Sequence, residues 1–146
     1  MTKLASDVMT ADPTRCSATT TLDEVAKLMR QFDCGEIPIV DTADRPIGVV
    51  TDRDIVCRVV AEGKNPAAHS AEQCMTSPVI TVQTDASLDD VLETMQRNQI
   101  RRLLVVDEEG CCAGIIAQAD VALATRPNDV GELVREVSRS TGLASH

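Results

Sequence analysis

The side chains best suited to ligand chemistry lie in the sequence VVTDRDIV, which ends at Val56. Thr51 and Asp54 are three residues apart at the expected start of a helix, where both can satisfy backbone N–H groups as a capping box. The same position suits a ligand, because a helix N-terminus favours anions and a carboxylate can accept hydrogen bonds from two adjacent ribose hydroxyls. The two interpretations are compatible, and both stay open.

Cationic side chains provide candidate phosphate donors. Arg53 lies inside this motif, and Arg101 and Arg102 precede the apolar run LLVV. Guanidinium groups are planar and permanently charged, which suits bidentate contacts to phosphate. A solvated start of a strand explains either Arg101 or Arg102 alone equally well, but it explains the adjacent pair less well.

The sequence around these residues is an internal repeat. A constant offset of 66 residues relates many equivalent positions in its two copies. In each copy, apolar residues at helical spacing follow Thr21 or Ser87 and predict an amphipathic helix. Two short β-branched runs with a polar turn then predict a hairpin, and helical spacing returns after it. The offset relates Met9 to Met75, Leu22 to Leu88, Gly48 to Gly114 and Asp54 to Asp120.

Composition divides the chain into four parts. We expect a first repeat at 1–61, a linker rich in Gly, Pro and small polar residues at 62–73, and a second repeat at 74–125. The remainder, 126–146, has an apolar stripe at 130–137 that predicts a helix with no counterpart in the first copy. We expect this helix to cover apolar core that the repeats leave exposed, or to contact a partner protein or a second copy of the chain.

Charge and composition exclude several classes of function. The net charge is −9 and aromatic residues make up 1%, so we expect no nucleic-acid partner, because such partners need cationic surfaces or stacking platforms. The sequence has no signal-peptide pattern and no run of about 18 apolar residues. We therefore expect a cytoplasmic protein without a membrane partner.

Cysteine and histidine patterns predict neither a metal site nor a catalytic site. The six cysteines show no CxxC or CxxH spacing, so we interpret them as small hydrophobic residues. The adjacent Cys111 and Cys112 are the best candidates for oxidation chemistry. Because His69 lies in the linker and His146 ends the sequence, a histidine base is not expected, and we predict that the protein is not an enzyme.

The repeated Met-Thr loop, the amphipathic helix, the runs IPIVD and LLVVD, and the motif G-h-h-T-x-x-D resemble a tandem pair of CBS domains, the Bateman module. The resemblance covers about Val8 to Ala124, and the layout is similar to small bacterial stress and hypoxia-response proteins of this family. It implies an α/β fold with a βαββα unit in each repeat, packed about a pseudo-two-fold axis. It also implies homodimers, no required cofactor, and clefts that bind AMP, ADP, ATP or S-adenosylmethionine as regulatory ligands.

The resemblance further implies composite clefts that take residues from both repeats. In the first cleft, the implied ribose contacts are Thr51 and Asp54, the phosphate contacts are Arg53, Arg101 and Arg102, and the adenine contacts are Ile80 and Ile100. The second cleft would use Asp120 and Ile37. This cleft departs from the family pattern and is expected to bind phosphorylated nucleosides weakly, because Ala117, Ala119 and Glu36 replace the hydroxyl and the cationic groups.

Three functions remain open from the sequence. The favoured one is a module that senses adenosine-containing nucleotides and regulates a separate protein, whose identity the sequence does not give. The second is a constitutive dimeric scaffold with vestigial clefts. The third is a thiol-based redox responder that uses Cys111 and Cys112.

Overall fold

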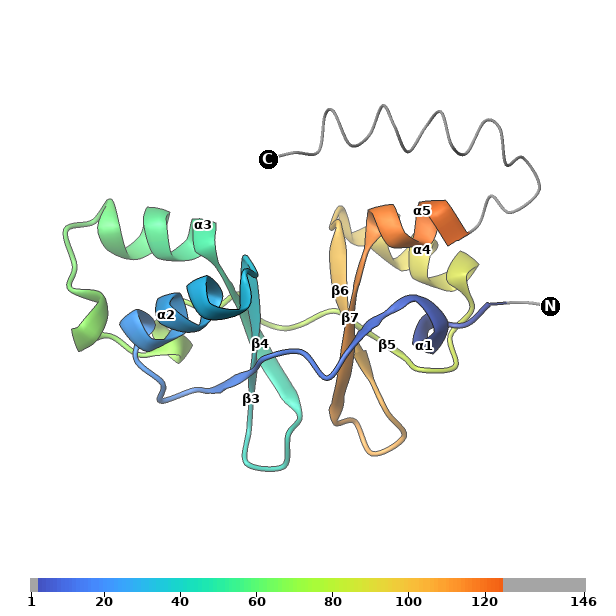
Figure 1. Cartoon of the computed structure of the whole chain (residues 1–146), viewed down its shortest axis with the longest axis horizontal. Coiled ribbons are helices and arrows are strands. Elements are labelled where there is room, and N and C mark those ends of the chain that lie inside the picture. Colours follow the sequence, from blue (N-terminus) through green and yellow to red (C-terminus); the bar gives the residue numbers. More distant parts are fainter. Residues whose placement is uncertain (1–2, 125–146) are drawn as a thin grey trace.

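The computed structural model describes residues 3–124 and places each repeat around its own sheet. The two sheets lie side by side at the centre, with helices packed outward from both (Figure 1). This arrangement confirms the predicted α/β fold with two repeats. The extension at 126–146, including the helix predicted at 130–137, lies outside the described residues.

The two sheets are built in the same way. In each, a hairpin is extended by a short parallel strand, and the second sheet gains a further strand at its edge. The first sheet has the order β2 (Cys16–Ser17), β3 (Glu36–Val40) and β4 (Pro46–Thr51). The second has the order β1 (Thr10–Ala11), β7 (Cys112–Ala117), β6 (Arg102–Val106) and β5 (Thr81–Gln83). Register follows the repeat, since Glu36 pairs with Thr51 and Arg102 with Ala117.

The predicted amphipathic helices are confirmed as α2 (Leu22–Phe32) and α4 (Leu88–Asn98). Each buries one stripe against its own sheet, which is where apolar spacing of three and four residues places side chains. Both end at a residue in the left-handed conformation, Asp33 with φ 51° and Gln99 with φ 55°. The buried positions are Leu22, Val25 and Met29 in α2, and Leu88, Val91 and Met95 in α4.

The remaining helices are short. The hairpins lead into α3 (Asp52–Ile55), which continues as a π-helical turn at Val56–Val60, and into α5 (Gln118–Ala124). The chain begins with α1 (Ala5–Val8), and the predicted linker contains 3₁₀ turns at Pro66–Ala68 and Ala71–Gln73. No helix within residues 3–124 is long and apolar enough to cross a membrane.

The two repeats exchange their leading segments. Strand β1 pairs with β7 of the second repeat, and Ala5 is fully buried in the second core. Conversely, Cys74 is buried in the first core, and Thr76 forms a bridge to Val49 of the first hairpin. Each Met-Thr segment therefore lies on the sheet of the other repeat, so the sequence repeats are interleaved in space.

The repeated methionine and glycine form matching contacts that explain why both recur at the same offset. The side chain of Met75 lies over Gly48, and that of Met9 lies over Gly114. A Cβ atom on either glycine would overlap the methionine Sδ. The exchanged segments can lie this close to the sheets only because glycine has no side chain at these two positions.

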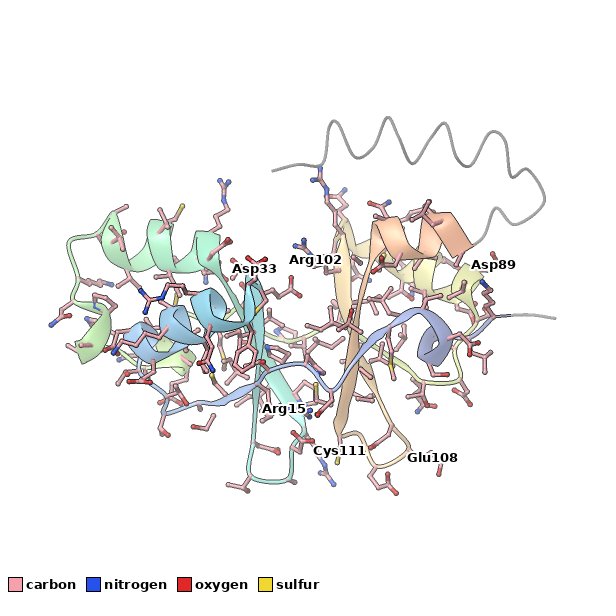
Figure 2. The ribbon with its side chains drawn as sticks, viewed as in Figure 1. Arg15, Asp33, Asp89, Arg102, Glu108 and Cys111 are labelled. Atoms are coloured by element: carbon pink, nitrogen blue, oxygen red, sulfur yellow. The ribbon has the colours of Figure 1, made fainter. Side chains whose placement is uncertain are left out.

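A polar cluster joins the two hairpin turns. The Arg15 guanidinium donates to both oxygens of Asp44, at 3.0 and 2.9 Å, and to the Cys112 carbonyl at 2.8 Å. The Cys112 N–H donates to the Asp44 carbonyl at 2.8 Å, and the Cys111 thiol donates to the Ala43 carbonyl at 3.3 Å. Figure 2 shows Cys111 beside the second hairpin turn and Arg15 between the sheets, so this cluster holds the repeats together at one end.

Candidate functional site

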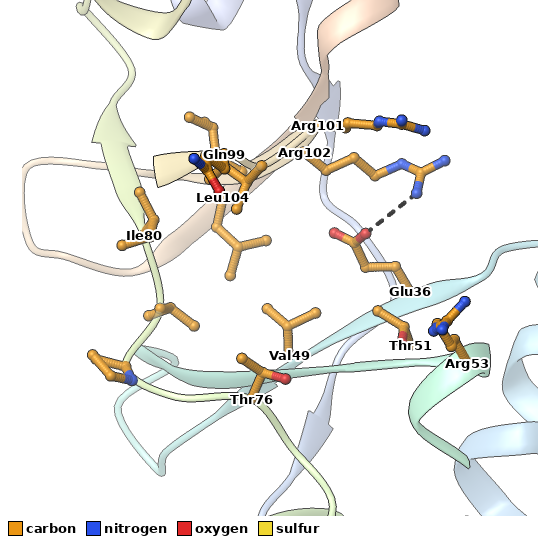
Figure 3. A pocket seen from close by; sticks show the side chains of 14 residues that line it. Glu36, Val49, Thr51, Arg53, Thr76, Ile80, Gln99, Arg101, Arg102 and Leu104 are labelled. Carbon is orange, nitrogen blue, oxygen red and sulfur yellow. Dashed lines mark ion pairs between the residues drawn. The ribbon is translucent and has the colours of Figure 1, made fainter. Parts of the chain in front are cut away.

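A cavity of about 560 Å³ lies between the repeats, above the end of β4 (Figure 3). Strand β4 and the first turn of α3 line one side, and the segment before β5 together with the start of β6 lines the other. The cavity contains six of the seven residues predicted for the first cleft, and Asp54 is not among its lining residues. The six are Thr51, Arg53, Ile80, Ile100, Arg101 and Arg102.

Thr51 and Asp54 form the capping box that their spacing predicted. The Asp54 N–H donates to Thr51 Oγ1 at 3.1 Å, and the Thr51 N–H donates to Asp54 Oδ2 at 3.0 Å. The other carboxylate oxygen, Oδ1, lies 3.8 Å from Arg58 Nε, and the Asp54 side chain is 14% exposed. Asp54 therefore fixes the start of α3 and the position of Thr51, which faces the cavity. Its contact with a ribose stays a prediction.

Three arginines line the cavity, one from the first repeat and two from the second. Arg53 belongs to α3, Arg101 precedes β6, and Arg102 begins β6. Figure 3 shows Arg101 and Arg102 on the side opposite Thr51 and Arg53. Opposed cations around one cavity can neutralise an anionic group from both sides, and planar guanidinium groups can bind its oxygens in pairs.

Glu36 also lines this cavity, which the sequence analysis missed because it placed Glu36 in the second cleft alone. Its Oε2 lies 3.7 Å from Arg102 Nη1. Glu36 and Arg102 occupy equivalent positions in the two repeats, so a pseudo-two-fold axis would bring them together. The offset of 66 residues is the signal that could have predicted this ion pair.

Burial raises the pKa of the Glu36 carboxyl above its ordinary value of 4.5. Asp52 and Asp54 add to the rise, and Arg102 opposes it. The cause is that a buried carboxylate loses hydration which one partly exposed arginine does not replace. At neutral pH the charged Glu36 therefore costs folding free energy.

This pKa shift predicts a pH-dependent effect of Glu36→Gln on stability. A raised folded-state pKa gives a stabilising contribution that is complete below pH 4.5 and is lost as pH rises through the folded-state pKa. We expect the glutamine variant to have a higher Tm than the native protein at pH 7, and a Tm close to native at pH 4. Thermal unfolding at both pH values measures this, and an equal Tm difference at both would contradict it.

The pseudo-symmetric second cleft has a volume of about 440 Å³. Its walls are the segment Thr10–Thr14, the residues Phe32–Glu36 at the end of α2, Arg102 and Ile115. Neither Asp120 nor Ile37 is among these lining residues, and Ile37 is fully buried in the first core. The structure therefore does not bring the two predicted residues together in this cleft.

The two clefts differ in charge although they share Glu36 and Arg102. Three arginines and one carboxylate line the first cleft. In the second, Asp12, Asp33 and Glu36 outnumber Arg102. Figure 2 shows Asp33 and Arg102 on the facing edges of the two halves. The first cleft therefore suits an anionic ligand, whereas the second disfavours one.

Cys112 is buried and Cys111 is half-buried. Burial raises the pKa of both, and nearby carboxylates including Asp44 add to the rise. A raised pKa reduces the fraction of reactive thiolate at neutral pH. Within residues 3–124 all six cysteines are free, and no three His, Cys, Asp or Glu side chains are arranged to hold a metal ion.

Comparison with known proteins agrees with this architecture. Residues 5–61 and 71–126 each match the family described as the CBS domain. The chain belongs to the CBS domain family. The matched segments include both hairpins and both walls of the first cleft, so the protein is a tandem CBS domain pair.

Two relatives share most of this CBS pair. Hypoxic response protein 1 of Mycobacterium tuberculosis (strain ATCC 25618 / H37Rv) is 33% identical over 141 residues, which cover 97% of this chain and 98% of that protein. The uncharacterized protein MK0525 of Methanopyrus kandleri is 38% identical over 133 residues, covering 91% of this chain and 65% of that protein. The chain thus aligns with nearly the whole of the first protein and with less than two thirds of the second.

A solved CBS pair has the same fold and holds ligands. The crystal structure of the CBS domain pair of protein MJ0100, in complex with 5-methylthioadenosine and S-adenosyl-L-methionine, is 26% identical in sequence. Its TM-score is 0.74, and the match covers 86% of this chain and 97% of that one.

Proposed function

We propose that this CBS pair is a regulatory module that binds an adenosine-containing nucleotide in the first cleft. The observation that carries the proposal is the convergence of Thr51, Arg53, Ile80 and the Arg101–Arg102 pair from both repeats around one cavity. The ligands in the MJ0100 crystal structure, both adenosine derivatives, support the ligand class.

Each part of the cleft has a chemical role in the proposal. Ile80 and Ile100 provide an apolar surface for adenine, and Thr51 with Asp54 accepts the ribose hydroxyls. Arg53, Arg101 and Arg102 bind phosphate. A nucleotide rather than a bare nucleoside is the preferred ligand because the cationic groups outnumber Glu36.

The ligand would act by stabilising one arrangement of the two repeats. Its contacts come from α3 of the first repeat and from the start of β6 in the second, so binding free energy depends on how these elements are placed. A separate protein that contacts both repeats would respond to a filled cleft.

Isothermal titration calorimetry against AMP, ADP, ATP and S-adenosylmethionine tests the proposal. Saturable binding near one site per chain is the expected result, because arginines outnumber carboxylates in the first of the two described clefts and not in the second. Absence of binding by all four ligands would contradict it. That result would favour a constitutive dimeric scaffold, for which the exposed side chains of Val56, Val60 and Leu123 offer an apolar contact.

The arginine pair predicts the preference of the cleft between AMP and adenosine. Replacing both Arg101 and Arg102 with glutamine should weaken AMP binding by roughly tenfold to a hundredfold, the scale of losing charge-assisted hydrogen bonds. Adenosine affinity should change little, since adenosine carries no phosphate. Calorimetry with both ligands measures the difference, and an undiminished preference for AMP would show that these arginines only face solvent.

A further inference from the structure

We propose that Glu36 sets the ligand preference of the first cleft by competing with the ligand phosphate for Arg102. The inference rests on the proposed nucleotide function. It assigns to Glu36 the role of a specificity-determining carboxylate within the same site. In the native protein, a ligand phosphate gains Arg102 only when Arg102 leaves its ion pair with Glu36.

The position of Glu36 places its carboxylate within reach of the phosphate-binding groups. Glu36 begins β3 and pairs with Thr51 on β4, so it lies beside the ribose-binding motif. In Figure 3 its carboxylate points across the cavity toward Arg102, to which the 3.7 Å ion pair joins it. The carboxylate therefore lies between the arginine and the motif that would hold the ribose.

The exposure of the two partners shows which of them is free to move. The Glu36 side chain is 13% exposed, whereas that of Arg102 is 58% exposed. A buried carboxylate is confined by its neighbours, while a long exposed arginine can change rotamer at little cost. Arg102 can therefore turn from Glu36 to a ligand, but Glu36 stays in the cleft and faces the incoming phosphate.

The other two arginines of the cleft, Arg53 and Arg101, are not paired with Glu36. Arg53 and Arg101 line the same cleft, and neither forms an ion pair with a carboxylate described between residues 3 and 124. Among the described residues, the phosphate thus meets two arginines without an ion-pair partner, one arginine paired with Glu36, and the Glu36 carboxylate itself. Adenosine carries no phosphate, so it enters the same cleft without electrostatic repulsion from the Glu36 carboxylate.

Affinities of the native protein, Glu36→Gln and Asp33→Asn for adenosine and AMP test this inference. Glutamine keeps the size of Glu36 and removes its charge, so AMP should bind about tenfold more tightly, the scale of one like-charge contact at intermediate dielectric. Adenosine affinity should stay within about twofold of native, the scale of a change that removes no ligand contact.

Asp33→Asn is the matched control. It changes net charge by the same amount but acts in the second cleft, at a left-handed position that asparagine tolerates. It should leave both affinities within about twofold of native, because the charge it removes lies outside the first cleft. An equal gain in AMP affinity from both variants would overturn the inference. It would show that the net charge of the protein, and not the position of Glu36, affects AMP binding.

A second comparison isolates the competition for Arg102. In the Arg102→Gln background, adding Glu36→Gln should give a smaller gain in AMP affinity than it gives in the native background. An undiminished gain, or a gain shared equally by adenosine and AMP, would overturn the inference. Absence of adenosine and AMP binding by every variant, including the native protein, would instead contradict the proposed function itself.

Discussion

Alanine at position 54 is expected to weaken AMP binding by about 1.5–3 kcal/mol, which is at least tenfold in Kd. Asp54 holds Thr51 at the cavity through the capping box, and its Oδ1 atom has only a 3.8 Å contact with Arg58. The variant therefore loses both the proposed ribose acceptor and the group that positions Thr51. Isothermal titration calorimetry with AMP measures the loss.

Asp120 provides the matched control for Asp54. It occupies the equivalent position at the start of α5, and neither residue is among the lining residues of a cleft. Asp54, however, is hydrogen-bonded to Thr51, which lines the first cleft, whereas Ala117 stands at the equivalent position beside Asp120 and does not line it. Asp120→Ala should therefore change AMP affinity by less than about threefold, within the scale of a change remote from the ligand. Equal losses from the two alanine variants would contradict the assignment of the ligand to the first cleft.

Asp54→Asn separates the two roles of Asp54. An amide oxygen can still accept from the Thr51 N–H, so the cap and the Tm should be largely kept, whereas alanine should cost about 1 kcal/mol of stability. If the asparagine variant binds AMP as the native protein does, the charge of Asp54 has no part in binding.

A large loss of stability is expected when a methyl group is added at Gly48 or Gly114, the two glycines beneath the exchanged segments. Gly48→Ala and Gly114→Ala should each lower the free energy of unfolding by about 1–3 kcal/mol, the usual cost of overpacking a well-filled interior. The reason is steric, since the new Cβ overlaps the Met75 side chain in one case and that of Met9 in the other. Urea denaturation of each variant measures the loss.

The two glycines should differ in how far they can be rescued. At Gly48 the three atoms nearest to an added Cβ all belong to the Met75 side chain. Met75→Ala removes the two nearest, Sδ and Cγ, so it should reduce the cost of Gly48→Ala. At Gly114 the backbone carbonyl of Thr10 also lies 2.9 Å from the Cβ position, and shortening Met9 cannot remove it. Double-mutant cycles compare the rescues, and equal rescue at both glycines would contradict this explanation.

The elements of this fold could be predicted from the sequence because they depend on local patterns. Apolar spacing located α2 and α4, and the β-branched runs located both hairpins. The capping box was also predicted, since its two residues are three positions apart. Six residues of the first cleft were predicted from the family resemblance. The resemblance implied that the two repeats form the cleft together, which spacing along the sequence does not predict.

Other features depend on how the repeats meet, which local patterns do not encode. The presence of Glu36 in the first cleft follows from an axis between the repeats, and the equivalent position of Arg102 was its only sequence signal. The family resemblance implied Ile37 in the second cleft, whereas Ile37 is buried in the first core and does not line that cleft. The run IPIVD has no alternation that shows which of its side chains face the core. The exchange of leading segments was missed because nothing in a Met-Thr loop specifies which sheet it joins.

The exchanged segments also determine when during synthesis the protein can complete its fold. Thr10 of β1 leaves the ribosome before its partner Ile115, which follows 105 residues further along the chain. Until β7 emerges, the first repeat can form its own hairpin, but Met9 has no glycine to cover. Completion of the second sheet therefore waits for nearly all of the described chain, and neither repeat matures as a separate folding unit.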